Sequence, residues 1–180
     1  MHQTLDSALL ASIPLFKGLT SEQRQRVADL TETVSFAPGD ILLTQGKTSP
    51  ELWVLLSGTC EVLKELPGAK HGATPTVLAV LEAFSIIGEV SFFHPAPHSA
   101  TVRAKSTVKL ARLCKAKFDA LSAEDPALAL QLAKNTIASL VDRFRRMDDW
   151  VVELLTHKTH DERVPEWGEL RRRLFDGWKA

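Results

Sequence analysis

Short apolar runs of about four to eight residues dominate the chain between Thr33 and Leu113. Glycine, proline and aspartate interrupt these runs, as in the turns at 36–40, 45–47 and 57–59. Many short antiparallel strands at such a spacing are typical of a jelly roll or barrel. The pattern predicts strands at 41–44, 52–56, 60–63, 77–81, 100–104 and 108–113, and a hairpin loop at 66–75.

Helical periodicity flanks this β-rich region on both sides. Residues 5–30 are predicted to be helical, with Thr20 or Ser21 as an N-cap. After the last strand, residues 115–121 form a short predicted helix, and Pro126 stands in the first turn of a long one. The predicted fold is therefore α+β, with an N-terminal helical segment (1–32), an antiparallel β-roll (33–122), a long helix (123–156) and a tail (157–180).

The long predicted helix has a row of apolar residues at steps that alternate between three and four. Such a heptad row favours pairing with an identical helix, whereas a helix that covers its own barrel usually has a broader apolar stripe. The alternative, a helix folded back on its own barrel, stays open. The predicted homodimer interface consists of Ala133, Ile137, Leu140, Phe144, Met147, Val151 and Leu154.

The most informative stretch for function runs from Phe84 to Val102. It begins like a buried strand with Ile86 and Ile87 and breaks at Gly88, which allows a close backbone approach. A carboxylate, Glu89, follows, and then a short apolar turn precedes two prolines. The N–H groups at the start of that turn are a candidate site for an anion.

This stretch resembles the phosphate-binding cassette of cyclic nucleotide-binding domains. Gly88 and Glu89 match the family's Gly-Glu pair, and Pro97 to Thr101 match its following segment, except that His98 stands at the Arg position. The turn glycines Gly39, Gly46 and Gly58 match as well, whereas Phe84 stands where the family usually has glycine. The resemblance implies a ligand site made of Ile87, Gly88, Glu89, Val90, His98, Ser99 and Ala100, with Arg143 as a candidate replacement cation.

His98 sets the expected affinity. In the family, Glu holds the ribose 2′-hydroxyl and Arg holds the cyclic phosphate, so a histidine that is mostly neutral at pH 7 implies weaker binding that improves at lower pH. Alternatively, the pocket binds another anion or none, and Glu89 only caps a helix. For Arg143, the sequence favours the alternative of a solvated position of the coil. His94 and His98 lack a third metal ligand nearby, so a metal site is disfavoured.

The composition limits the class of protein to which this chain can belong. With 44% hydrophobic residues, 24% charged residues and no net charge, the chain is expected to be a cytoplasmic globular protein without a general attraction to nucleic acid or membrane. Cys60 and Cys114 are expected to be reduced core residues. The residues beyond Leu155 are too few for a DNA-binding domain of at least about 50 residues. A Trp- and Arg-rich segment at 165–178 is a candidate docking helix.

These observations favour a homodimeric sensor that binds cAMP or cGMP and signals to a protein partner, with the tail as one candidate contact. The alternative is a ligand-free descendant of the same fold that acts as a docking module. An enzyme built on the related cupin barrel is disfavoured because no His-x-His pair occurs in the sequence.

Overall fold

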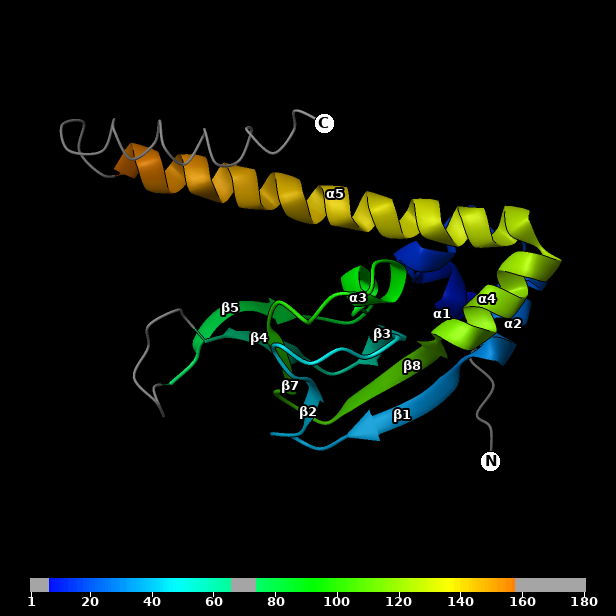
Figure 1. Ribbon diagram of the computed structural model, residues 1–180, viewed down its shortest axis with the longest axis horizontal. Coiled ribbons are helices and arrows are strands. Elements are labelled where there is room, and N and C mark those ends of the chain that lie inside the picture. Colours follow the sequence, from blue (N-terminus) through cyan, green and yellow to red (C-terminus); the bar gives the residue numbers. More distant parts are fainter. Residues whose placement is uncertain (1–6, 66–73, 158–180) are drawn as a thin grey trace. The chain divides into compact units, whose positions relative to one another are not determined.

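The computed structural model describes residues 7–65 and 74–157 (Figure 1). The chain divides into two units, Met1–Ser139 and Leu140–Ala180. The first unit contains every described strand and every described helix except the second part of the last one. The predicted loop at 66–75 lies mostly outside the described residues, as does the predicted tail beyond His157.

The strands form two four-stranded sheets with the orders β1-β8-β3-β6 and β2-β7-β4-β5, in which all pairs are antiparallel. This arrangement, with helices before and after the strands, confirms the predicted α+β fold with a β-roll. The strands are β1 (Glu32–Phe36), β2 (Ile41–Leu43), β3 (Glu51–Ser57), β4 (Cys60–Lys64), β5 (Thr76–Leu81), β6 (Ile86–Ile87), β7 (Thr101–Ala104) and β8 (Val108–Cys114).

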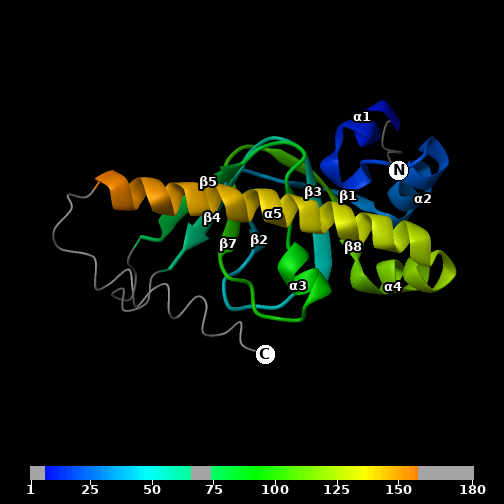
Figure 2. The same ribbon diagram turned by 90° about the horizontal axis from the view of Figure 1, so that it is seen from above.

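The helices before and beside the strands gather at one end of the first unit. Both Figure 1 and Figure 2 show α1, α2 and α4 together at the same end of the strand layers. The helical elements are α1 (Ser7–Ser12), the 3₁₀ turn η1 (Pro14–Phe16), α2 (Ser21–Leu30), α3 (Glu89–Phe93), α4 (Lys115–Glu124) and α5 (Pro126–His157). The predicted N-terminal helical stretch is therefore interrupted, because the chain passes through the left-handed region at Gly18.

Thr20 is the N-cap of α2, as the sequence predicts. Its side chain accepts a hydrogen bond from the backbone N–H of Gln23, and the Gln23 side chain accepts one from the N–H of Thr20. This reciprocal capping box fixes where α2 begins. By contrast, β1 is not among the predicted strands, because its sequence ETVSF contains only two apolar residues, Val34 and Phe36, and forms no apolar run.

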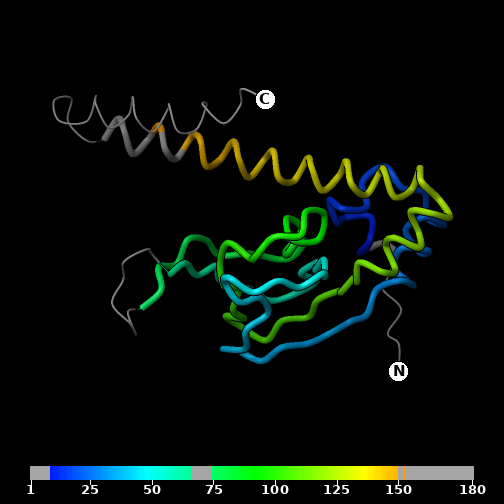
Figure 3. The backbone as a smooth tube through the Cα atoms, in the orientation of Figure 1, coloured from blue at the N-terminus to red at the C-terminus, as the bar shows by residue number. Residues whose placement is uncertain are grey.

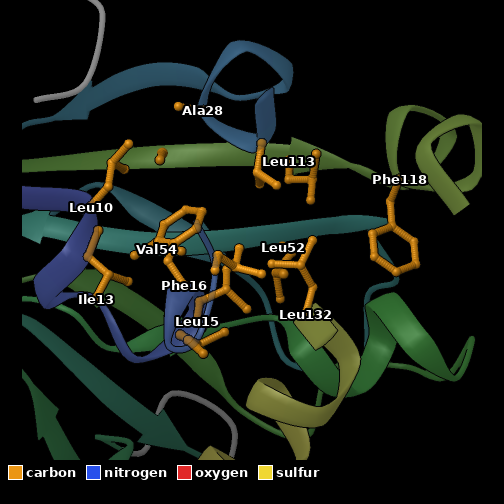
Figure 4. Close-up of a cluster of buried hydrophobic side chains, with 14 of the residues drawn as sticks. Leu10, Ile13, Leu15, Phe16, Ala28, Leu52, Val54, Leu113, Phe118 and Leu132 are labelled. Atoms are coloured by element: carbon orange, nitrogen blue, oxygen red, sulfur yellow. The ribbon is translucent and has the colours of Figure 1, made fainter. Parts of the chain in front are cut away.

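Two apolar clusters lie on opposite faces of β3. Leu52 and Val54 belong to a cluster that includes Leu10 and Phe16 from the N-terminal elements and Leu132 from α5 (Figure 4). The residues between them on β3 point the other way, into a second cluster between the two sheets. That cluster contains Leu43, Trp53, Leu55, Cys60, Ile87, Val102, Ala104, Val108 and Leu110. The strand is one continuous apolar run because it is buried on both faces.

Cys60 belongs to the cluster between the sheets. It is fully buried and free of any disulfide, and burial raises the pKa of its thiol to about 11. Cys114, at the end of β8, is also free and half-buried. A thiol with a raised pKa stays protonated at neutral pH, so Cys60 acts as a small apolar residue.

The first turns of α5 bury one face and leave another exposed. Leu128, Leu132 and Thr136 are buried at intervals of four residues, and the Asn135 side chain donates hydrogen bonds to the carbonyls of Leu15 and Lys17. This face covers the first apolar cluster. The predicted heptad row adjoins this face, since Leu140 stands one turn after Thr136.

Members of the heptad row are exposed or half-buried in the single chain. Ile137 and Phe144 are 58% and 57% exposed, and Met147 is 51% exposed. Ala133 and Leu140 are half-buried, whereas the side chains of Val151 and Leu154 are outside what the structure describes. The pairing of two such helices therefore stays a prediction. In the part of the chain that the structure describes, no helix is long and apolar enough to cross a membrane.

Candidate functional site

The candidate cassette begins where β6 ends. Ile86 and Ile87 pair with Val54 and Trp53 of β3, which fixes the position of the following residue, Gly88. Gly88 has φ +82°, and a Cβ placed on it would lie 2.7 Å from the carbonyl oxygen of Glu51. Both the left-handed backbone and the close approach require glycine. The backbone tube in Figure 3 shows the chain passing from here through α3 to β7, in green.

Glu89 is the first residue of α3 and lies on its buried side. The side chain is only 4% exposed, and Ser91 and Phe92 on the same short helix are also buried. Val90 and Phe93 point outward and are 53% and 38% exposed. A carboxylate is costly to bury unless hydrogen-bond donors face it. The burial of Glu89 therefore distinguishes it from an ordinary capping acid on a solvated helix end.

His98 is the second buried ionisable residue of the cassette. It is 7% exposed, with Nδ1 2.9 Å from the Ser91 hydroxyl and Nε2 3.0 Å from the Ser49 hydroxyl. Its backbone N–H donates to the carbonyl of Lys47, and its carbonyl accepts from the N–H of Gly46. His98 thus connects α3 with the loop between β2 and β3.

Burial lowers the pKa of His98 below its ordinary value of 6.5, although the nearby Glu51 carboxylate acts in the opposite direction. At neutral pH the imidazole is therefore uncharged, with one ring nitrogen as donor and the other as acceptor. Both nitrogens already contact serine hydroxyls. His98, which stands at the family's arginine position, is consequently a buried, neutral side chain that links two segments by hydrogen bonds.

The remaining candidate ligand residues lie on both sides of His98. Ile87 is buried, Ser99 is exposed and Ala100 is half-buried just before β7. Thr101 accepts a hydrogen bond from the backbone N–H of Gln45. The structure thus joins residue 98 to α3 through the contact between His98 and Ser91. Arg143 belongs to the second unit, so its assignment to this site stays a prediction.

One cation at the cassette is not among the residues predicted from the sequence. The Lys64 ammonium, at the end of β4, donates a hydrogen bond to the carbonyl oxygen of Ser99. No local pattern in the sequence could have identified this contact, because it depends on how β4 pairs with β7.

Phe84 has an unusual backbone conformation for a phenylalanine. It has φ +73°, the only non-glycine residue in the left-handed region among the residues that the structure describes. Its N–H donates to the carbonyl of Leu55 at 2.6 Å, and its side chain packs against the first apolar cluster. The backbone therefore has a conformation that favours glycine, and the ring of Phe84 is held against the cluster all the same.

The two histidines of the cassette lie in different surroundings. Among the described residues, no group of three or more His, Cys, Asp and Glu side chains is arranged to hold a metal ion. His94 is exposed, whereas His98 is buried with its ring nitrogens against serine hydroxyls.

Comparison with known proteins gives a consistent set of similarities. The sequence model of the cyclic nucleotide-binding domain matches residues 33–125. The cAMP-dependent protein kinase regulatory subunit of Blastocladiella emersonii is 32% identical over 115 residues, which are 63% of this chain and 27% of that protein. The chain spans about a quarter of the length of the first curated relatives it matches.

Solved structures show the same similarity. A cyclic nucleotide-binding domain from Methylobacillus flagellatus superposes with a TM-score of 0.73 and 25% identity, covering 86% of this chain and 83% of that one. The catabolite activator protein of Thermus thermophilus superposes with a TM-score of 0.64 and 25% identity, covering 79% of this chain and 63% of that one.

Proposed function

Because the chain belongs to the cyclic nucleotide-binding domain family, we propose that it is a regulatory module that binds a cyclic mononucleotide, cAMP or cGMP, at its cassette. The observation on which this depends most is the buried Glu89 carboxylate directly after Gly88. A carboxylate with little access to water is a strong acceptor, and a sugar hydroxyl is a donor that suits it. The relatives named as cAMP-dependent support the choice of ligand class.

The proposed division of roles follows the cassette. Glu89 accepts from the ribose hydroxyl, and the backbone N–H groups near Gly88, Ser99 and Ala100 donate to the cyclic phosphate. His98 contributes no fixed charge, because it is buried and its pKa is lowered. Loss of one charge-assisted pair costs about 1.5–3 kcal/mol, or about 10- to 150-fold in affinity. We therefore expect weaker binding than an arginine at this position would give.

Isothermal titration calorimetry with cAMP and with cGMP tests this function. We expect saturable binding by the wild type, and a loss of about tenfold or more in affinity for Glu89→Gln, because the neutral amide accepts less strongly and removes the charge. Glu82→Gln is the matched control, since Glu82 is exposed just before the cassette. Absence of both heat and a thermal shift at millimolar ligand would remove the proposed function.

The proposed regulatory output uses α5. A ligand biases a protein only through contacts that differ between its states. The exposed row with Ile137, Phe144 and Met147 supports a homodimer in which α5 pairs with its copy. Under this proposal the dimer presents a changed surface to a protein partner, and residues 165–178 are one candidate contact.

A second candidate, a ligand-free docking scaffold, is favoured by one specific observation. The ring nitrogens of His98 contact the hydroxyls of Ser49 and Ser91, so this part of the cassette is held by side chains of the protein itself. A scaffold predicts that no cyclic nucleotide changes the protein's thermal stability while a partner is still captured. Pull-down with the chain truncated after His160 then tests whether the tail binds the partner. If the shortened chain retains every partner, the tail is not the binding segment.

A further inference from the structure

A cyclic phosphate in the cassette needs a positive charge that the cassette itself does not provide. The stretch from Phe84 to Val102 contains no lysine or arginine. His98 is buried and both its ring nitrogens contact hydroxyls. Any fixed charge for the ligand must therefore come from a neighbouring element.

Lys64, at the end of β4, is the candidate for this source of positive charge. The antiparallel pairing of β4 with β7 runs without interruption from Cys60 opposite Ala104 to Leu63 opposite Thr101. Lys64 is the next residue of β4, so it lies beside the place where the chain leaves Ala100 and enters β7. That place is the end of the cassette.

The ammonium of Lys64 reaches the cassette directly. It donates to the carbonyl oxygen of Ser99, the residue that follows His98. An ammonium has three donors, so this single bond leaves further donors for an anion. The contact also holds the charge beside the backbone of Ser99 and Ala100, where the proposed function puts the phosphate.

The charge of Lys64 is not neutralised by a carboxylate among the described residues. Arg103, in the same sheet, is by contrast paired with Glu61 at 2.6 Å, which is typical of a structural cation. Lys64 takes part in none of the ion pairs of the described chain and is half-buried. A cation with no carboxylate partner keeps its full charge for an incoming anion.

We propose that Lys64 is an anion-binding residue of this site and supplies the positive charge for the cyclic phosphate that His98 does not supply. The inference rests on the proposed function. Under this proposal a residue of β4 pairs with the phosphate, as an arginine of the cassette would. The affinity then depends on the point charge of a lysine and not on a bidentate guanidinium.

The test is calorimetric titration of Lys64→Gln and Lys64→Arg with cAMP and cGMP at two salt concentrations. We expect Lys64→Gln to lose about tenfold or more in affinity and to show a smaller dependence of affinity on salt, because one charge is removed. Lys64→Arg keeps the charge and is expected to retain most of the affinity. Lys105→Gln, which removes an exposed charge between β7 and β8, is the matched control.

The outcomes separate the two proposals. If the wild type binds neither nucleotide, the proposed function fails. If the wild type binds and Lys64→Gln binds equally well with the same salt dependence, the function stands and the role of Lys64 is wrong. If Lys64→Gln and Lys64→Arg lose affinity equally, Lys64 only positions Ser99, which also overturns the charge role. Thermal unfolding of each variant checks that the fold is retained.

Discussion

At the scale of single residues, Gly88 shows how a backbone conformation and a close contact together determine a residue. Its φ of +82° alone disfavours a side chain, and a Cβ there would lie 2.7 Å from the Glu51 carbonyl oxygen. Gly46 has nearly the same φ, +79°, but no atom lies within 4 Å of the place where a Cβ would stand. Comparing the two glycines therefore separates the conformational cost from the steric cost.

We expect Gly88→Ala to lower the free energy of unfolding by clearly more than Gly46→Ala. A left-handed alanine costs about 1–2 kcal/mol, and the clash with Glu51 adds backbone displacement of the strand that supports the cassette. Urea unfolding of both variants measures the difference. Equal destabilisation would show that β3 and β6 separate freely at this point, which contradicts the close packing.

His98 gives a pH prediction with a definite sign. Because burial lowers its pKa in the folded protein, the unfolded chain binds a proton first, near pH 6.5. The neutral imidazole therefore contributes stability above this pH, and that contribution is lost as the pH falls towards the lowered folded pKa. We expect the unfolding free energy of the wild type to decrease between about pH 7.5 and about pH 5.

His98→Gln is expected to show a smaller decrease over the same range, because its side chain does not titrate. His94→Gln replaces an exposed histidine of the same loop and serves as the control. The measurement is chemical unfolding at several pH values. A pH dependence of His98→Gln identical to that of the wild type would mean that His98 is not buried in its neutral form.

At the scale of elements, the strands and turns could be predicted because their signals are local. Every predicted strand overlaps a strand of the roll, whereas the long helix begins at Pro126 and not at 123, because residues 122–124 belong to α4. The position of Lys64 could not be predicted in this way, because it depends on the pairing of β4 with β7 and on the position of Ser99. The burial of His98 likewise depends on hydroxyls from α3 and from the β2–β3 loop.

The long helix shows the limit of periodicity most clearly. The heptad row predicts pairing with a second helix and disfavours covering of the barrel, yet the first turns of α5 also bury a neighbouring row with Leu128, Leu132 and Thr136. One helix therefore has both kinds of apolar surface. Periodicity detects each row, but only the folded chain shows which row faces its own core.

At the scale of the whole molecule, the exposed row on α5 predicts a homodimer. Ile137 and Phe144 are each more than half exposed, and Val141 and Met147 on the same helix are also exposed. Full burial of an exposed side chain of this type contributes about 1.5–3 kcal/mol, so these half-exposed ones contribute roughly half of that each at an interface that excludes water. Light scattering after size exclusion should give twice the mass of the chain, and the melting temperature should rise with protein concentration.

The double variant Ile137→Glu with Phe144→Glu should be monomeric, because pairing would bury carboxylates against each other. Arg145→Glu, an exposed change of charge outside the row, should leave the dimer intact. The folded β-roll should persist in the monomer, since Leu128 and Leu132, which are not part of the row, still cover its core. A wild type that is monomeric at all concentrations would contradict the predicted dimer and the proposed route from ligand to partner. Nucleotide binding would not be affected by that result, because calorimetry tests it separately.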